Sequence, residues 1–371
     1  MHNKIEFLDL KKITNLHHQE YMQVIDDVLK DGWFIIGKRL KNFEEEYASF
    51  SQTKYSVGLA NGLDALILSL IALDIGVGDE VIAPSNTYIA SWLAITHSGA
   101  TIRPVEPRID TYNINCELVE AAINNKTKAI MAVNLYGQSS ELTKLKAICT
   151  KYNLYLIEDN AQSQGAKCDN KLTGSFGDIN ATSFYPGKNI GAFGDGGAIT
   201  TDNFELLNKI LTLRNYGSKI KYFNDVIGYN SRLDELQAAI LSIKLKYLDL
   251  DNQHRVKIAH LYNNLLTGIG DLVLPMIAEN CTSVYHIYLI RTKKRNALQD
   301  YLSSENISTM IHYPLPPHLQ KAYLYLGYKK GDFPIAEEIA NTSLSLPIGP
   351  HLSVLEIEYI CEKIKQFFNK Q

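Results

Sequence analysis

Paired cysteines, long apolar runs and an excess of one charge are all scarce in this sequence, and each scarcity excludes a class of protein. The five cysteines lie far apart, with no CxxC spacing and no cysteine–histidine cluster, so we expect neither a zinc site nor a disulfide framework. No uncharged apolar run approaches the ~18 residues of a membrane helix. The net charge of −3 argues against a broad nucleic-acid-binding face, so any anionic ligand must be bound by local groups.

Length and apolar content are sufficient for a large core. A chain of 371 residues with 46% hydrophobic residues would normally divide into two domains. Its N-terminus, "MHNKIEFLDLKK", lacks the charged-then-apolar order of a signal peptide. We therefore expect a cytoplasmic enzyme with no bound metal and no membrane or nucleic-acid partner.

Strand-like apolar runs alternate with helical patterns from about residue 54 to residue 215. This order predicts an α/β fold with a mostly parallel sheet between helices. The segment 231–266 has a pattern typical of long helices, and the pattern changes after it. We predict a large domain over 1–250 and a smaller C-terminal α+β domain over 251–371. The predicted strands span 54–60, 80–85, 101–106, 128–136, 154–159, 179–185 and 196–201, with helices at 63–75 and 141–153 between them.

One lysine, Lys188, lies between an aromatic-rich strand end and a glycine-rich loop in "SFYPGKNIGAFGDGG". The residues around it do not fit the Walker A pattern, and "GAFGDGG" does not fit the dinucleotide-binding pattern GxGxxG. A solvated loop lysine is one interpretation. The other is an amine desolvated by Phe184, Tyr185 and Phe193, whose pKa would be lowered as imine formation requires.

An imine-forming lysine indicates pyridoxal phosphate if a carboxylate for the ring nitrogen, an anion site and a flat side chain accompany it. Ligands of parallel sheets gather beyond the carboxyl ends of strands. Asp159, at the end of a strand, is the candidate carboxylate, although a turn or capping aspartate would look the same. The amides of Gly62 and Leu63 are a candidate phosphate site or an ordinary strand-to-helix turn. Tyr88 is a candidate stacking side chain or a core aromatic.

With these segments in place, the sequence resembles the sugar-nucleotide aminotransferases of the DegT/DnrJ type, which have the aspartate aminotransferase-like fold type I. The resemblance covers nearly the whole chain, from "DGWFIIGKRLKNFEEEYA" through "IEDNAQSQGA" to "HYPLPPHLQ" and "LSLPIGPH". It implies that Lys188 carries the cofactor, that Asp159 contacts the pyridine nitrogen and that Gln162 contacts the phenolic oxygen. It also implies stacking by Tyr88 and phosphate binding by Ser183 with the Gly62 and Leu63 amides.

The same resemblance implies an assembly and a type of reaction. Asn230 of "GYNSR" would reach the cofactor phosphate of the neighbouring subunit, which implies a homodimer with active sites at the subunit interface. A related dehydratase branch has histidine at the lysine position, so Lys188 favours transamination. The implied donor is L-glutamate, with pyridoxamine phosphate as the intermediate form of pyridoxal 5′-phosphate.

Several segments are most similar to the branch that aminates C3 of dTDP-3-keto-6-deoxyhexoses, which would give a Fuc3N or Qui3N type sugar for lipopolysaccharide or a related glycan. Two alternatives stay open: a C4-specific nucleotide-sugar or cyclitol aminotransferase of the same fold, and a non-catalytic cofactor-binding regulator. Lys219 and Lys221 are candidate diphosphate ligands or solvated loop charges. His312 and Tyr313 are candidate sugar contacts or part of a structural turn. A further candidate for substrate binding is Tyr185.

Overall fold

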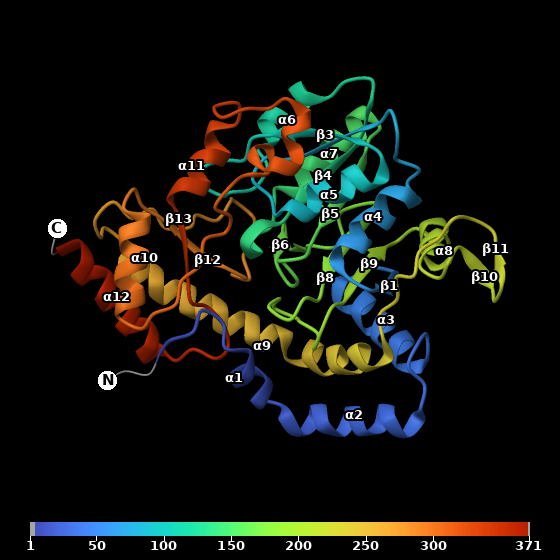
Figure 1. Ribbon diagram of the computed structural model, residues 1–371, viewed down its shortest axis with the longest axis horizontal. Helices are drawn as coiled ribbons and strands as arrows, with labels where there is room; N and C mark the ends of the chain where they lie inside the picture. The colour runs from blue at the N-terminus through green and yellow to red at the C-terminus, as the bar shows by residue number, and fades with distance from the viewer. Residues whose placement is uncertain (1–3, 370–371) are drawn as a thin grey trace.

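The computed structural model describes residues 4–369, and a seven-stranded sheet forms the centre of its larger part (Figure 1). The strand order is β1-β9-β8-β5-β4-β2-β3. Strand β9 runs antiparallel to both of its neighbours, and the other neighbouring strands pair in parallel. The seven predicted strands and the mostly parallel sheet are therefore confirmed. The strands are β1 Tyr55–Leu59, β2 Glu80–Pro84, β3 Thr101–Val105, β4 Thr127–Val133, β5 Tyr155–Asp159, β8 Ile179–Ser183 and β9 Gly197–Thr201.

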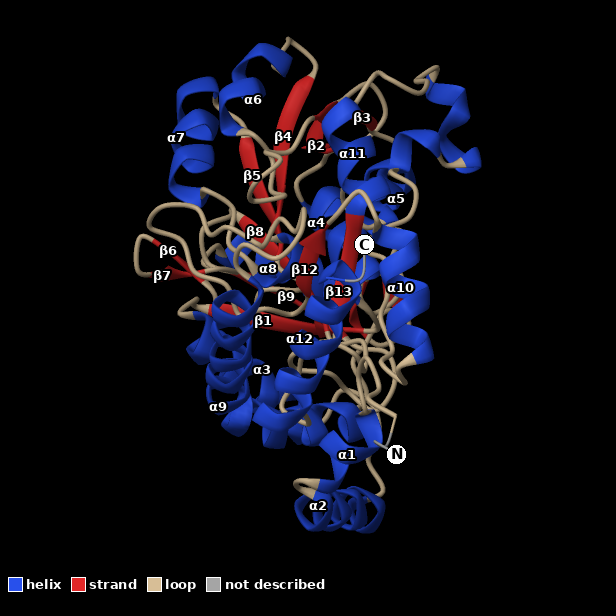
Figure 2. Cartoon of the chain, turned by 90° about the vertical axis from the view of Figure 1, so that its left-hand side faces the viewer, coloured by secondary structure: helices blue, strands red, loops and turns tan. Residues whose placement is uncertain are grey.

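Helices cover both faces of this sheet because successive side chains of its strands enter two different apolar clusters. In β4, Ala129 and Met131 pack under α4, α5 and α8, whereas Ile130 and Ala132 pack under α6 and α7. Figure 2 shows α6 and α7 on one side of the strands and α4 and α5 on the other. These helices are α4 Gly62–Ala72, α5 Ile89–Ser98, α6 Cys116–Ala122, α7 Leu142–Tyr152 and α8 Phe204–Leu213.

One helix of 32 residues, α9 (Glu235–Leu266), joins the two parts of the molecule. Its first half packs against α2 and α3, and its second half packs in the C-terminal core with α12. The prediction of more than one helix over 231–266 is wrong, because no glycine or proline interrupts the helical part of this segment. The N-terminal helices are α1 Leu10–Asn15, α2 His18–Asp31 and α3 Lys38–Ser51.

The C-terminal part has its own apolar core, built around the antiparallel pair of β12 and β13. Ile5 of the N-terminal segment belongs to this core and pairs with Ile307. Residue 250 falls inside α9, and the domain boundary proposed there stays a prediction. The elements are β12 Tyr288–Arg291, β13 Ser343–Leu346, α10 Arg295–Ser304, α11 Pro334–Thr342, α12 Val354–Asn369 and the 3-10 turns Pro317–Leu319 and Lys321–Leu326.

The sequence patterns do not predict two short hairpins. The pair β6 (Lys167–Cys168) and β7 (Lys171–Leu172) brings Cys168 opposite Cys281 in an antiparallel bridge, although both thiols are free. The pair β10 (Ser218–Ile220) and β11 (Phe223–Asn224) lies at the edge of the molecule in Figure 1. A 3-10 turn, Leu135–Gly137, follows β4. Within residues 4–369, no helix is both long enough and apolar enough to cross a bilayer.

Candidate active site

A cavity of about 800 Å³ lies between the carboxyl ends of the parallel strands and the C-terminal part of the molecule. Residues that follow β1, β2, β4, β5 and β8 form one wall, as expected for an open parallel sheet. The opposite wall includes residues just before β12 and in the 310–313 segment. The cavity brings together ten of the predicted site residues: Gly62, Leu63, Tyr88, Asp159, Gln162, Ser183, Tyr185, Lys188, His312 and Tyr313.

Lys188 lies in the turn that follows β8, and the fully buried Phe184 holds the start of this turn. The Lys188 amide donates to the Tyr185 carbonyl at 2.8 Å, and the Ala192 amide donates to the Phe184 carbonyl at 2.7 Å. Burial lowers the pKa of Lys188 to about 8, although Asp159 acts in the opposite direction. A solvated loop lysine does not fit this environment.

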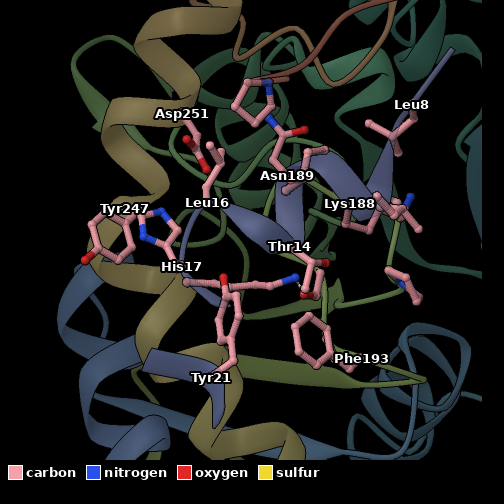
Figure 3. Close-up of a pocket in the computed structure, with 18 of the residues that line it drawn as sticks. Leu8, Thr14, Leu16, His17, Tyr21, Lys188, Asn189, Phe193, Tyr247 and Asp251 are labelled. Atoms are coloured by element: carbon pink, nitrogen blue, oxygen red, sulfur yellow. Dashed lines mark hydrogen bonds between the residues drawn. The ribbon is translucent and has the colours of Figure 1, made fainter. Parts of the chain in front are cut away.

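A second, smaller cavity of about 280 Å³ lies behind the Lys188 turn, against α1, α2 and α9 (Figure 3). Lys244 of α9 donates to the Gly191 carbonyl and lies 4.7 Å from the centre of the Phe193 ring. Burial lowers the pKa of Lys244 to about 8. Lys244 thus holds the glycine-rich loop from the side of the smaller cavity. Among the described residues, Lys188 is the one lysine that lines the larger cavity.

Asp159, the last residue of β5, is 7% exposed, and each of its carboxylate oxygens has a partner. Oδ2 accepts a hydrogen bond from the Ser91 hydroxyl at 2.8 Å, and Oδ1 accepts one from the Ala161 amide at 3.2 Å. Burial raises the pKa of Asp159, while these bonds and the Lys188 charge lower it. The ionised carboxylate would therefore gain from a further cation in the cavity, such as a protonated ring nitrogen.

The beginning of α4 forms an anion site beside Ser183. Asn61 caps the helix by accepting from the Asp64 amide at 2.8 Å. The Gly62 and Leu63 amides, in the first turn, donate to no group in residues 4–369. A Cβ added at Gly62 would lie 2.6 Å from the Ser183 Cβ, so glycine permits this close approach. Two free amides, a hydroxyl and the positive end of the helix dipole are suited to a phosphate group.

Gln162 and Tyr88 approach the same cavity from different elements. Gln162 Oε1 accepts from the Tyr136 amide at 2.7 Å, and its Nε2 donates to the Tyr313 hydroxyl at 3.2 Å. Tyr88 precedes α5 and is 52% exposed, so it is not a core aromatic. Its ring lies 5.2 Å from the Tyr313 ring, inclined by 39°. An oriented amide and an open aromatic face are thus available to a planar ligand.

Three predicted site residues lie elsewhere. Lys219 and Lys221 are exposed on and after β10, and Asn230 is exposed just beyond the hairpin, where it pairs with Asn215. None of the three lines the cavity of its own chain.

Other cavity residues were not predicted. Asn134 directly follows β4 and could have been found by the same strand-end criterion as Asp159. Ser91 has no local signal, because its role depends on the packing of α5 against β5. His286 lies on the opposite wall, before β12. The described residues contain no group of three or more histidine, cysteine, aspartate or glutamate side chains placed to hold a metal ion.

The groups that line the cavity fit pyridoxal phosphate. Lys188 supplies a desolvated amine, and Asp159 supplies a buried carboxylate that gains from a cationic partner. The free Gly62 and Leu63 amides supply an anion site with Ser183. These are the groups that an aldehyde, a pyridine nitrogen and a phosphate each require.

Comparison with known proteins agrees with this geometry. The model of the DegT/DnrJ/EryC1/StrS aminotransferase family matches residues 15–365. A protein of Aneurinibacillus thermoaerophilus, described as dTDP-3-amino-3,6-dideoxy-alpha-D-galactopyranose transaminase, is 51% identical over 98% of this chain and 99% of its own. The crystal structure of S. venezuelae DesV with a ketimine intermediate superimposes with a TM-score of 0.97 at 42% identity, covering 99% of both chains. NtdA from Bacillus subtilis with bound cofactor PMP gives a TM-score of 0.92 at 31% identity, covering 100% of this chain and 86% of NtdA.

Proposed function

The chain belongs to the DegT/DnrJ/EryC1/StrS aminotransferase family, and from that premise we propose that it transfers an amino group from L-glutamate to C3 of a dTDP-3-keto-6-deoxyhexose. It is a pyridoxal phosphate-dependent aminotransferase of fold type I. The name of the relative that is 51% identical supports the C3 position and a product of the galacto (Fuc3N) type. The observation on which the proposal depends is that Lys188 and Asp159 line one cavity.

The described residues suggest how the cofactor would be held. Lys188 would bind its aldehyde carbon and Asp159 would contact its ring nitrogen. The Gly62 and Leu63 amides and the Ser183 hydroxyl would bind its phosphate, Tyr88 would stack on its ring, and Gln162 would donate to its phenolic oxygen. When bound, pyridoxal phosphate supplies the electron-accepting ring that stabilises negative charge on the carbon being deprotonated.

Lys188 is the proton carrier of the proposed reaction. Its Nζ, once free, takes a proton from the donor carbon and later delivers one to C3 of the sugar. A pKa of about 8 allows the neutral amine to accept a proton and the ammonium to return it near neutral pH. General acid–base catalysis of this kind contributes typically ~10² to 10⁴-fold, and Lys188 would also hold the cofactor, so Lys188→Ala should abolish turnover.

Substrate recognition is assigned to both walls of the cavity. Tyr185, His312 and Tyr313 line it and would contact the sugar. The nucleotide diphosphate needs cations, which Lys219 and Lys221 would supply to the cavity of the neighbouring subunit, together with the Asn230 contact to the phosphate of the cofactor. This proposal is supported by their location on an exposed segment that does not line the cavity of their own chain.

The homodimer is part of the same proposal. Large apolar side chains are exposed on and beside the β10–β11 hairpin, where water would otherwise solvate them at a cost. They include Ile220, Tyr222, Phe223, Val226 and Ile227. A cytoplasmic location and a product used for lipopolysaccharide or a related glycan are further predictions from the sequence.

A colour assay followed by a substrate panel tests the proposal. The purified protein with added pyridoxal phosphate should turn yellow and lose this absorbance on addition of glutamate, whereas Lys188→Ala should show neither change. Mass spectrometry with 3-keto and 4-keto nucleotide sugars should then show amination of the 3-keto sugar, and proton NMR should show the galacto configuration at C4. A 4-keto sugar or a cyclitol as the sole acceptor would overturn the C3 assignment. A protein that never turns yellow would contradict the assignment as a pyridoxal phosphate-dependent aminotransferase.

A further inference from the structure

His286 is a side chain of the larger cavity to which the reaction above gives no role. It lies two residues before β12, on the wall opposite Asp159, and lines the cavity together with Lys188. Its surroundings include the Lys188 ammonium, which contributes to lowering the His286 pKa. The tautomer and the protonation state of the ring decide which nitrogen can bind a ligand and whether that nitrogen donates or accepts.

A chain of amide hydrogen bonds determines which His286 nitrogen carries the proton. The chain begins at the Gln164 carbonyl, which can only accept, and Asn252 Nδ2 donates to it at 2.9 Å. Asn252 Oδ1 therefore accepts from Asn189 Nδ2, at 2.8 Å. Asn189 Nδ2 also lies 3.3 Å from the Val284 carbonyl, which fixes the same orientation of this amide a second time.

The Asn189 oxygen is consequently left to accept from His286. Asn189 Oδ1 lies 3.1 Å from His286 Nδ1, and since Oδ1 has no proton, Nδ1 must be the donor. In the neutral ring Nε2 is then an acceptor, and it has no hydrogen-bond partner within residues 4–369. Figure 3 shows Asn189 between Lys188 and the α9 helix that carries Asp251, so the residue after the lysine connects α9 to the wall of the cavity.

The ring is also held neutral. Burial and the charges of Lys188 and Arg255 lower the His286 pKa well below its ordinary value, with a further contribution from His312. Each of these causes favours the neutral form of the ring. A neutral imidazole of fixed tautomer is a hydrogen-bond acceptor over the whole range in which the enzyme would work.

We propose that His286 Nε2 accepts a hydrogen bond from the amino group being transferred, on the donor in the first half of the reaction and on the sugar in the second. This inference rests on the proposed aminotransferase function and adds a substrate contact to it. Lys188 moves the proton on carbon, while His286 orients the nitrogen by one of its N–H bonds. The amide chain makes Asn189 and Asn252 positioning residues, which act through His286.

The tautomer is tested first, by a measurement that does not depend on turnover. In holoenzyme labelled with ¹⁵N-histidine and deuterated elsewhere, His286 should give the signals of a neutral Nδ1–H ring between about pH 6 and pH 9. Asn189→Leu, which removes the acceptor of the Nδ1–H, should add the Nε2–H form. An Nε2–H ring or a titrating ring in the wild-type enzyme would overturn the inference.

Binding of two matched ligands that cannot be transaminated tests the contact. 2-Methylglutamate carries the amino group but no hydrogen on its α-carbon, and 2-methylglutarate lacks the amino group. His286→Leu should weaken binding of the amine roughly tenfold to hundredfold, the value of a hydrogen bond to a charged group, and leave the other ligand unchanged. His286→Gln, whose amide oxygen can accept, should recover part of the loss, and His260→Leu on the exposed surface of α9 should change neither.

The outcomes separate the two proposals. An equal loss for both ligands in His286→Leu would make His286 structural, and no loss for either would exclude the contact. If the wild-type enzyme binds neither ligand and its colour does not respond to glutamate, glutamate is not the donor and the proposed function fails in that respect. The NMR result for the ring would still decide whether Nε2 is available as an acceptor.

Discussion

At the scale of single residues, the chemistry depends on the environment that the fold gives to ordinary side chains. A lysine amine is a nucleophile only after it has lost its proton. Phe184 is fully buried at the start of the Lys188 turn, and Lys244 fastens the loop behind it, so the Lys188 amine is kept in a poorly solvated position. The same environment raises the pKa of Asp159. Burial therefore acts on both groups, and each becomes less charged than it would be in water.

This environment predicts the pH dependence of Lys188 in the cofactor-free protein. Burial disfavours the ammonium form, so the pKa falls to about 8 and the neutral fraction rises through that pH rather than through about 10.4. Brief labelling with acetic anhydride, followed by mass spectrometry of the peptide that contains Lys188, should give a rate that reaches its plateau above about pH 9. Nα-acetyl-lysine in the same tube is the control. Identical profiles for the two amines would contradict the desolvation.

The lowered pKa of Lys188 also makes the free energy of unfolding depend on pH. Between about 8 and the unfolded value, the unfolded chain binds the proton and the folded chain does not, so Lys188 makes the protein more stable as pH rises through this window. Below about 8 both states are protonated and the penalty for burying the ammonium is complete. The functional amine is thus maintained at a cost in stability near neutral pH.

At the scale of elements, the N-terminus of one helix is held by the first residue of another. Glu235, which begins α9 and is 2% exposed, accepts hydrogen bonds from the Gly37, Arg39 and Leu40 amides at 2.7, 2.9 and 3.0 Å. These amides belong to the start of α3 and have no helical acceptor of their own. A single carboxylate therefore fixes α3 against α9, the helix that also supplies Asn252 and Lys244.

Removing this carboxylate should destabilise the protein strongly. In Glu235→Ala the buried amides lose their acceptor, which should lower the free energy of unfolding by about 3–5 kcal/mol, measured from the midpoint of chemical denaturation. Glu45→Ala is the matched control, because Glu45 is exposed on α3 and forms a surface ion pair with Lys41 at 3.8 Å, which contributes about 0–1 kcal/mol. Equal losses in the two variants would rule out this capping role.

At the scale of the whole molecule, the edge of the described chain around the β10–β11 hairpin exposes large apolar side chains to solvent. Ile227 is 95% exposed beside the β10–β11 hairpin, and this hairpin carries the two lysines proposed for the nucleotide diphosphate. Contiguous exposed apolar side chains are typical of an interaction surface. In the proposed homodimer, the same contact would bury these side chains and bring the lysines to the second cavity.

The dimer predicts a linked loss of assembly and activity. Ile227→Asp would place an unpaired charge in the interface, so sedimentation velocity should show a monomer with little turnover. Val77→Asp is the matched control, since Val77 is 93% exposed in the loop before β2, and it should leave the dimer intact. A monomeric wild-type protein with full activity would contradict the homodimer, and a dimeric, active Ile227→Asp protein would place the interface elsewhere.

Much of the fold could be predicted because apolar periodicity is a local property of the chain. The strands ending at Leu59, Pro84, Asp159 and Ser183 are each marked by a short apolar run followed by polar residues. In a parallel sheet the carboxyl ends of such strands meet at one edge. Local patterns alone therefore predict that Gly62, Tyr88, Asp159 and Lys188 belong to one site.

The contacts that tune these residues could not be predicted in the same way. Ser91 reaches Asp159 across 68 positions of the sequence, and Asn189 reaches Asn252 across 63. His286 obtains its fixed tautomer from Asn189, Asn252 and the Gln164 carbonyl, which come from three different segments. No spacing rule connects such residues, because their distance depends on how the elements pack.

Local sequence patterns therefore determined how strands and helices alternate along the chain and which chemical groups follow the strands, since hydrophobic period and turn residues act over a few positions. The tertiary structure decided the rest: that Lys188 and Asp159 face one cavity, that His286 stands opposite them, and that Lys219, Lys221 and Asn230 lie outside it. These outcomes depend on nonlocal packing, which sets the burial and the hydrogen-bond partners of each group and so its protonation state.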